Sequence, residues 1–183
     1  MQMSKKLLVT GLLLSGLFCG AFLLNAGAQT VPMTDPQIEL IRNNCTSSKS
    51  TLNQLHSSDA LLRVNIGQTY ESMSAKLMEK FNIRVINNSL NNTNLTVATT
   101  NYNLLLGVFR ADYMIYEKQL TIAMGVDCNV QPVAFYDAVA LTRTNRNQIH
   151  DDVIKLNQSL AQYIVALDQL GIDNQIKLQE GIK

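Results

Sequence analysis

The sequence predicts an all-α protein: an elongated antiparallel up-down-up bundle of three long helices that follows an N-terminal signal segment. Three observations predict this class. The three prolines stand at positions 32, 36 and 132, so none of them interrupts residues 37–131 or the chain after 132. No Asn-Gly or Asp-Gly dipeptide indicates a β-hairpin. Apolar residues recur at alternating steps of three and four, which is the heptad pattern of long helices packed at shallow angles.

The first 28 residues have the organisation of a secretory signal peptide. Two lysines and no acidic residue precede an apolar stretch, 7–24, that carries no charge, and small residues follow at Ala26 and Ala28. This pattern predicts cleavage between Ala28 and Gln29. The alternative is an uncleaved anchor, because the apolar stretch is long enough to span a membrane. Both alternatives place the rest of the chain outside the cytoplasmic membrane, because the two lysines stay on the inner side.

A flexible leader, 29–35, is expected between the signal segment and a helical domain of residues 36–170. The first helix is predicted over 36–86, because Asp35 can cap it and Pro36 suits the first helical position. Ser57, Ser58 and Asp59 favour caps over helix interiors, so a split at this point is a four-helix alternative. The predicted buried seam of this helix comprises Ile41, Cys45, Ser48, Leu52, Leu55, Asp59, Leu62, Ile66, Tyr70, Met73, Leu77 and Phe81.

The second and third helices are predicted over 94–124 and 132–170. An asparagine-rich turn at 87–94 precedes the second helix, and Pro132 opens the third. Gly171 is interpreted as a C-terminal stop, which leaves residues 171–183 as a tail. The second seam comprises Leu95, Ala98, Tyr102, Leu105, Phe109, Tyr116, Leu120 and Ala123. The third comprises Val139, Thr142, Arg146, Ile149, Val153, Leu156, Leu160, Tyr163, Leu167 and Leu170.

Cysteine usage predicts one disulfide bond. Cys19 lies in the signal segment, so a mature chain keeps Cys45 and Cys128. An even pair in an exported protein indicates a bridge, although two buried free thiols are the alternative. A bridge between them closes a loop of about 84 residues, worth roughly 4–5 kcal/mol in the chain-entropy account.

The same bridge predicts how the first and third helices align. In an up-down-up bundle these two helices run parallel, and the bridge sets Cys45 level with the loop before Pro132. Asp59 then lies level with Arg146. Both are charged residues in seam positions, so we expect an ion pair that fixes the alignment of the helices more than it stabilises them.

Charge and motif content exclude several classes of function. The formal net charge is +1, and no excess of lysine and arginine indicates a nucleic-acid-binding surface. The mature chain has two histidines, His56 and His150, which the register keeps apart; both are interpreted as surface residues. No nucleophile elbow, metal-binding motif or phosphate loop is present. We therefore expect no enzymatic activity, no cofactor and no metal.

One exposed contact is expected on the second helix. Tyr113 lies one step off the predicted seam and is close to Arg110, so this pair is the candidate surface contact. Apolar residues outside the three seams form only a modest excess, at Leu61, Leu104, Leu106 and Ile122.

These expectations favour a non-enzymatic helical-bundle protein, secreted or held in the periplasm or cell envelope. It would act by protein–protein interaction, with an unknown partner or by self-association, or as a structural module. Contact with a membrane is expected only through the N-terminal segment, if that segment is uncleaved. The alternative is a carrier or holdase chaperone that binds apolar ligands or unfolded chains between its helices.

Overall fold

The computed structural model describes residues 32–180, and in this range the chain consists of helices joined by short turns, without strands, as predicted for an all-α protein. The predicted signal segment and its cleavage point at Ala28 and Gln29 lie outside the described residues. The helices belong to one compact unit that begins at Met33. They are α1 (Asp35–Asn43), α2 (Cys45–Leu62), α3 (Gln68–Ser72), α4 (Glu79–Asn87), α5 (Thr93–Gly125) and α6 (Pro132–Glu180).

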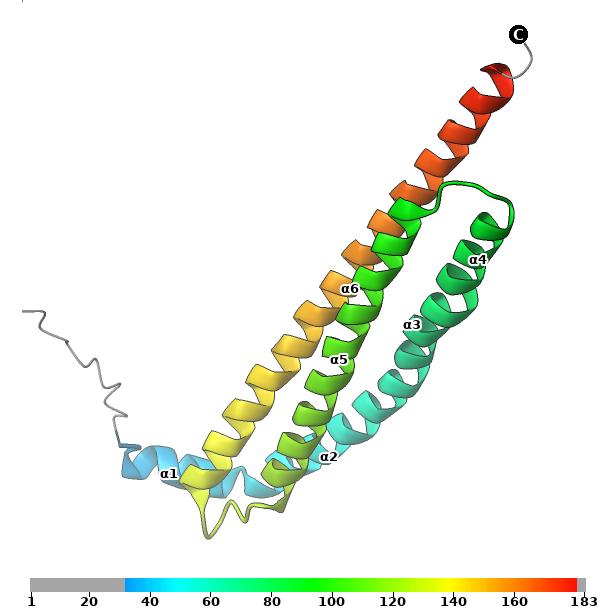
Figure 1. Cartoon of the computed structure of the whole chain (residues 1–183). Coiled ribbons are helices and arrows are strands. Elements are labelled where there is room, and N and C mark those ends of the chain that lie inside the picture. Colours follow the sequence, from blue (N-terminus) through cyan, green and yellow to red (C-terminus); the bar gives the residue numbers. More distant parts are fainter. Residues whose placement is uncertain (1–31, 181–183) are drawn as a thin grey trace, which may run out of the picture. The chain divides into compact units, whose positions relative to one another are not determined.

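The helices α2, α3 and α4 form one continuous helical stretch, because two π-helical turns join them: η1 (Arg63–Gly67) and η2 (Met73–Met78). This stretch, α5 and α6 lie side by side, and α5 and α6 share the most extensive contact (Figure 1). The short helix α1 lies near the start of α6, where the Nε of Arg42 donates a hydrogen bond to the carbonyl oxygen of Asn129 at 3.2 Å.

The first long helix is interrupted at Asn44, and the alternative split at Ser57–Asp59 does not occur. At Asn44 the backbone leaves the helical conformation (φ −100°, ψ 7°), and its side-chain amide donates to the carbonyl oxygen of Leu40 at 2.8 Å. Asparagine favours this kind of local hydrogen bond over a helix interior. Ser57 and Ser58 instead donate to backbone carbonyls of the preceding turn, so α2 continues through them.

The predicted stop at Gly171 is wrong, because α6 continues to Glu180. A glycine ends a helix when it adopts a left-handed conformation and the chain beyond it turns away. Gly171 does not adopt a positive φ, and no proline follows it. The residues after it include good helix formers, which offset its cost of about 1 kcal/mol.

The core consists of two clusters of buried side chains. The first cluster is centred on Tyr102, Met78 and Leu156, and the second on Tyr116, Leu120 and the two cysteines. Each of these side chains is at most 5% exposed. Where the α2–α4 stretch contacts α6, the two contacting residues are separated by nearly the same number of sequence positions. The separation is 87 residues for Asp59 and Arg146 and 85 for Met78 and Tyr163. A constant separation means that the two stretches run in the same direction.

The buried seam of the first stretch slips by one residue in its second half. Leu77 and Phe81 were predicted to be buried, but they are 63% and 38% exposed, whereas Met78 and Asn82 take the inner positions. The inner residues follow at steps of four through Tyr70, Ser74, Met78 and Asn82. Steps of four exceed the helical repeat of 3.6, and the wider π turn of η2 accommodates them. The slip moves two large apolar side chains to the surface.

Candidate functional site

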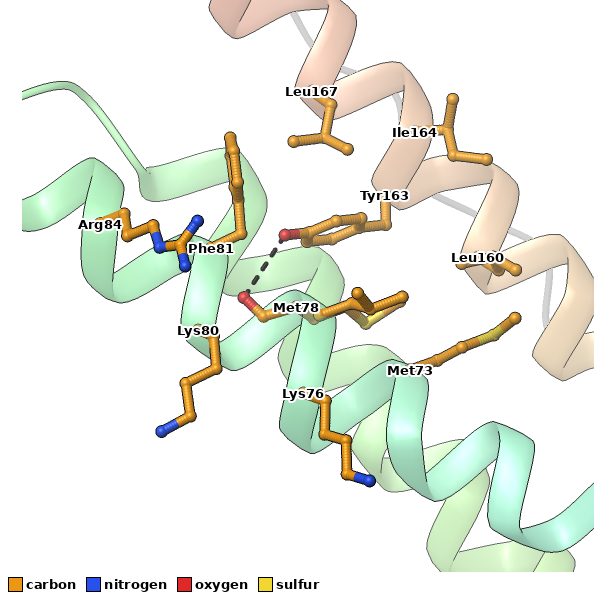
Figure 2. Close-up of a pocket in the computed structure, with 11 residues that line it drawn as sticks. Met73, Lys76, Met78, Lys80, Phe81, Arg84, Leu160, Tyr163, Ile164 and Leu167 are labelled. Carbon is orange, nitrogen blue, oxygen red and sulfur yellow. Dashed lines mark hydrogen bonds between the residues drawn. The ribbon is translucent and has the colours of Figure 1, made fainter.

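An open apolar groove runs between η2–α4 and α6, with a volume of about 460 Å³. The displaced Leu77 is one of its lining residues. Phe81 lies on one side of the groove, and Ile164 and Leu167 of α6 lie on the other (Figure 2). Further lining comes from Met73, Met78, Leu160 and Tyr163. The groove is therefore a surface made of apolar side chains from two helical stretches that run in the same direction.

Three cations follow one edge of this groove. Lys76, Lys80 and Arg84 are four residues apart, so they share one face of the helix, and all three are exposed (Figure 2). None of the salt bridges formed by the described residues includes them. The acid closest in sequence, Glu79, accepts a long hydrogen bond from Ser74 instead. The groove thus combines an apolar floor with positive charge that no carboxylate of the described residues neutralises.

The floor of the groove is fixed by hydrogen bonds beneath it. The Tyr163 hydroxyl lies 3.4 Å from the carbonyl oxygen of Met78 (Figure 2). It also lies 3.2 Å from the Oδ1 of Asn82. Asn82 in turn donates to the Oγ1 of Thr99 on α5 at 2.8 Å. Burial raises the pKa of Tyr163, which keeps the hydroxyl protonated. These buried polar groups satisfy each other, so none of them needs a ligand as a hydrogen-bond partner.

The disulfide predicted from the cysteine count is present in the structure. Cys45 at the start of α2 is bonded to Cys128 in the loop before α6, with 5.5 Å between the Cα atoms. Cys128 is fully buried, and Phe135 and Leu52 belong to the same cluster. The bridge therefore anchors α2 to the end of the core at which α6 begins.

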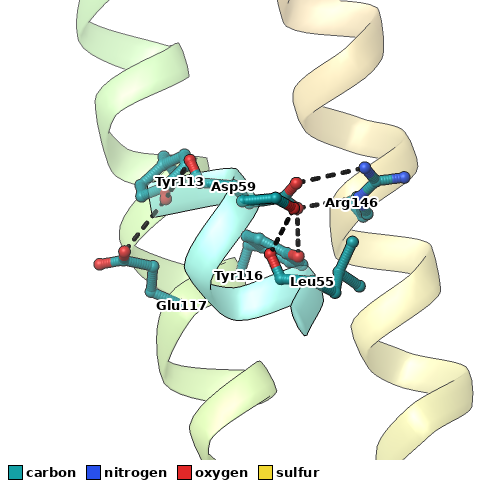
Figure 3. A network of polar contacts seen from close by, with 7 residues as sticks. Leu55, Asp59, Tyr113, Tyr116, Glu117 and Arg146 are labelled. Carbon is teal, nitrogen blue, oxygen red and sulfur yellow. Dashed lines mark hydrogen bonds and ion pairs between the residues drawn. The ribbon is translucent and has the colours of Figure 1, made fainter. Parts of the chain in front are cut away.

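The structure also brings Asp59 and Arg146 together. The Nε of Arg146 donates to Asp59 Oδ2 at 3.0 Å, and the buried Tyr116 hydroxyl donates to the same oxygen at 2.6 Å (Figure 3). Burial alone would raise the pKa of Asp59, but the hydrogen bonds from Arg146 and Tyr116 and the charge of Arg146 lower it below its usual range. One carboxylate therefore joins all three long helical stretches.

Tyr113 is not the exposed contact that was predicted. It is 5% exposed, and its hydroxyl contacts the Asp59 carbonyl oxygen and the Glu117 carboxylate (Figure 3). Phe109 and Tyr116 are seven residues apart, and the buried residue between them can lie three or four positions after Phe109. In the structure it lies four positions after Phe109, which is Tyr113. Arg110 is half exposed and pairs with Glu71 of α3, so the two predicted contact residues have different partners.

Asp152 is a buried acid of α6 that lies on a second buried stripe, which the sequence pattern did not reveal. It is 1% exposed, and its Oδ1 accepts hydrogen bonds from Gln148 and Lys155. Its Oδ2 has no hydrogen-bond partner. Asp112 of α5 lies against it, and burial together with the neighbouring Asp152 carboxylate raises the pKa of Asp112. The two acids face each other across the contact between α5 and α6.

Replacement of Asp112 by asparagine should raise the free energy of unfolding at pH 7 by about 1 kcal/mol, because the amide can donate to the unpartnered Asp152 oxygen. The raised pKa of Asp112 means that its protonated form favours folding. Its contribution is therefore present below about pH 4 and is lost as the pH rises through the folded-state value. Urea unfolding should show the gain at pH 7 and little at pH 3. An equal gain for Asp151→Asn, an exposed control, would contradict this assignment.

Both histidines lie within the described residues, and no metal-binding group includes them. His56 is half-buried and His150 is exposed. Within residues 32–180, no group of three or more histidine, cysteine or acidic side chains is arranged to hold a metal ion. In the same range, no helix combines the length and apolarity of a membrane span. Comparison with known proteins found no matching family model, curated protein or solved structure.

Proposed function

We propose that the chain is an exported, non-enzymatic protein of the cell envelope or extracellular space, an up-down-up bundle that acts by protein–protein interaction. Its binding surface is the groove between η2–α4 and α6, and its partner presents an amphipathic helix with acidic residues along one edge. The observation that supports this proposal most strongly is the apolar groove with three positively charged side chains along its edge.

The geometry of the groove favours a helix as the occupant. An amphipathic helix binds by placing apolar side chains at i, i+3, i+4 and i+7 into a groove between helices. The exposed Leu77, Phe81 and Ile164 offer such a helix apolar contacts along the length of the groove. Acidic residues on the edge of the bound helix would pair with Lys76 and Lys80. This pairing would fix the orientation of the bound helix and would increase the rate at which it associates with the groove.

A defined peptide tests this function. The probe is a synthetic 18-residue helix with leucines at i, i+3, i+4 and i+7 and glutamates along one edge, and its counterpart carries lysines there. Fluorescence anisotropy should show saturable binding of the glutamate peptide and at least tenfold weaker binding of the lysine peptide, about 1.4 kcal/mol. Equal affinities for the two peptides would contradict the proposal.

Charge reversal at the rim adds a matched comparison. Lys76→Glu/Lys80→Glu should weaken binding of the glutamate peptide at least tenfold, because the rim then repels it. Arg143→Glu/Lys177→Glu changes the net charge equally at exposed positions outside this groove, and it should bind almost as well as the parent chain. If both double variants lose affinity equally, the effect comes from net charge and the groove is not the site.

The carrier function remains a second candidate, favoured by the size of the groove. Its volume of about 460 Å³ lies within the range of small-molecule sites, roughly 300–1,000 Å³. An anionic amphiphile such as palmitate would place its chain against Phe81 and Leu167 and its carboxylate at the cations. Saturable binding of palmitate, with neither peptide bound, would favour the carrier over the interaction protein.

A further inference from the structure

A second apolar seam follows the outer face of α5, opposite its buried face. Five large apolar residues lie on it and are each about half exposed: Val97 (56%), Leu104 (66%), Val108 (45%), Ile115 (55%) and Ile122 (47%). Monomeric proteins rarely expose a long continuous apolar stripe, and such stripes mark interaction sites. This stripe spans 25 residue steps, or about 37 Å of helix.

The stripe has the spacing of a coiled-coil seam. Steps of four and three alternate without interruption, and every residue on it is exposed: Val97, Asn101, Leu104, Val108, Ala111, Ile115, Lys118 and Ile122. In heptad terms, Asn101, Val108, Ile115 and Ile122 occupy the a positions. In coiled coils, a single asparagine at an a position among apolar residues specifies the register of pairing.

The stripe is complementary to a second copy of itself in the antiparallel direction. A two-fold axis between Val108 and Ala111 would place these two residues opposite each other, since each a position then faces a d position. The same axis sets Leu104 against Ile115, Val97 against Ile122, and Asn101 against Lys118. Apolar residues thus meet apolar residues, and the two polar residues meet each other. A parallel pair in register would instead place the two Lys118 side chains together, which like charge disfavours.

The exposed apolar area approaches the lower bound of specific interfaces. The exposed fractions of the five apolar residues and of the flanking Met114 (61%) correspond to roughly 600 Å² on each copy. Complete burial of these side chains on two copies would bury at most about 1,200 Å², which is the lower bound of specific interfaces. Gly107 lies beside the axis, and no atom lies within 4 Å of where a side chain would begin, so the backbones can approach closely there.

We propose that the chain forms a homodimer in which the outer faces of two α5 helices pack antiparallel across a two-fold axis between Val108 and Ala111. This inference goes beyond the proposed groove-binding function, because a different face carries it. The groove residues belong to η2, α4 and α6, and none belongs to α5. The dimer leaves each groove free to bind its partner.

Size-exclusion chromatography with light scattering tests the dimer on the purified chain. The parent protein should have twice the monomer mass at about 50 µM. Leu104→Glu/Ile115→Glu should be monomeric there, with a dissociation constant raised at least 30-fold and an unchanged helical circular dichroism spectrum. The groove variant Lys76→Glu/Lys80→Glu should stay dimeric, so loss of groove binding and loss of dimerisation are read separately. A parent protein that is monomeric at 50 µM would overturn the proposal.

Cysteine cross-linking tests the direction of packing. Leu104→Cys/Ile115→Cys should form a covalent dimer on mild oxidation, because these positions face each other across the axis. Leu104→Cys alone should not, because its own counterpart lies about 16 Å further along the helix. Efficient cross-linking of the single Leu104→Cys variant would show a parallel pair and would refute the antiparallel interface.

Discussion

Replacement of both Cys45 and Cys128 by serine should lower the free energy of unfolding by about 4 kcal/mol. The bridge spans 83 residues, and a cross-link that closes a loop of this length restricts the unfolded chain strongly. It also anchors the start of α2 to the buried loop before α6, where Cys128 is completely enclosed. Urea unfolding of the oxidised chain and of the double-serine variant measures this difference.

The matched control for the disulfide is the response to reductant. Tris(2-carboxyethyl)phosphine should destabilise the parent chain to nearly the level of the variant, and it should leave the variant unchanged. Thiol labelling of the unreduced, denatured parent chain gives an independent check. Two reactive thiols from Cys45 and Cys128 in that experiment would contradict the bridge.

Replacement of Asp59 by alanine should lower the free energy of unfolding by about 3 kcal/mol. The Tyr116 hydroxyl, which is buried, would lose the acceptor that lies 2.6 Å away, and an unsatisfied buried hydroxyl costs about 1–3 kcal/mol. The lost pairing with Arg146 contributes less, because that side chain is 51% exposed and water can solvate it. Tyr116→Phe in the Asp59→Ala background should therefore recover part of the stability.

The same carboxylate makes stability depend on pH in acid. The pKa of Asp59 is lowered in the folded protein, so its ionised form favours folding. This contribution is complete above the unfolded value of about 3.9 and is lost as the pH falls through the lower folded value. The parent chain should lose stability more steeply than Asp59→Asn between about pH 4 and pH 2. If the free energy of unfolding fell in parallel with pH for the two proteins, the partners of Asp59 would not lower its pKa.

Much of the fold follows from local sequence signals. The turns at 87–94 and before Pro132 contain residues that disfavour a helix interior, and α5 and α6 begin within one residue of the predicted positions. The alignment of Asp59 with Arg146 follows from helix geometry once the two cysteines are joined. The break at Asn44 and the continuation through Gly171 could not be derived in this way. Asn44 and Gly171 can each adopt either a helical or a non-helical backbone conformation. The contacts that neighbouring residues make in the folded protein decide which conformation is adopted.

The groove could not be predicted from heptad spacing, because π turns interrupt that spacing. A uniform repeat buries Leu77 and Phe81, whereas η2 turns Met78 and Asn82 inward. The signal available in the sequence was the cation spacing of Lys76, Lys80 and Arg84, which indicates a single charged face. Such a face is usually solvated, and only the slipped seam places apolar residues beside it.

In the sequence, the outer seam of α5 gives only a modest excess of apolar residues outside the predicted seams. Leu104 and Ile122 were noted as apolar residues outside the seams, together with Leu106, which the structure buries at 2% exposure. Two heptad patterns overlap on one helix here, and periodicity alone does not say which of them faces the core. The structure separates the two, because the residues of one pattern are buried and those of the other are exposed.

We propose that the chain acts by protein contact in the groove between η2–α4 and α6. Titration of the isotope-labelled chain with the glutamate peptide, followed by nuclear magnetic resonance, tests this claim most directly. The largest amide shift changes should map to Leu77, Phe81 and Ile164 and should saturate with the peptide. Shift changes confined to other surfaces, or no saturable change at these residues, would contradict the account.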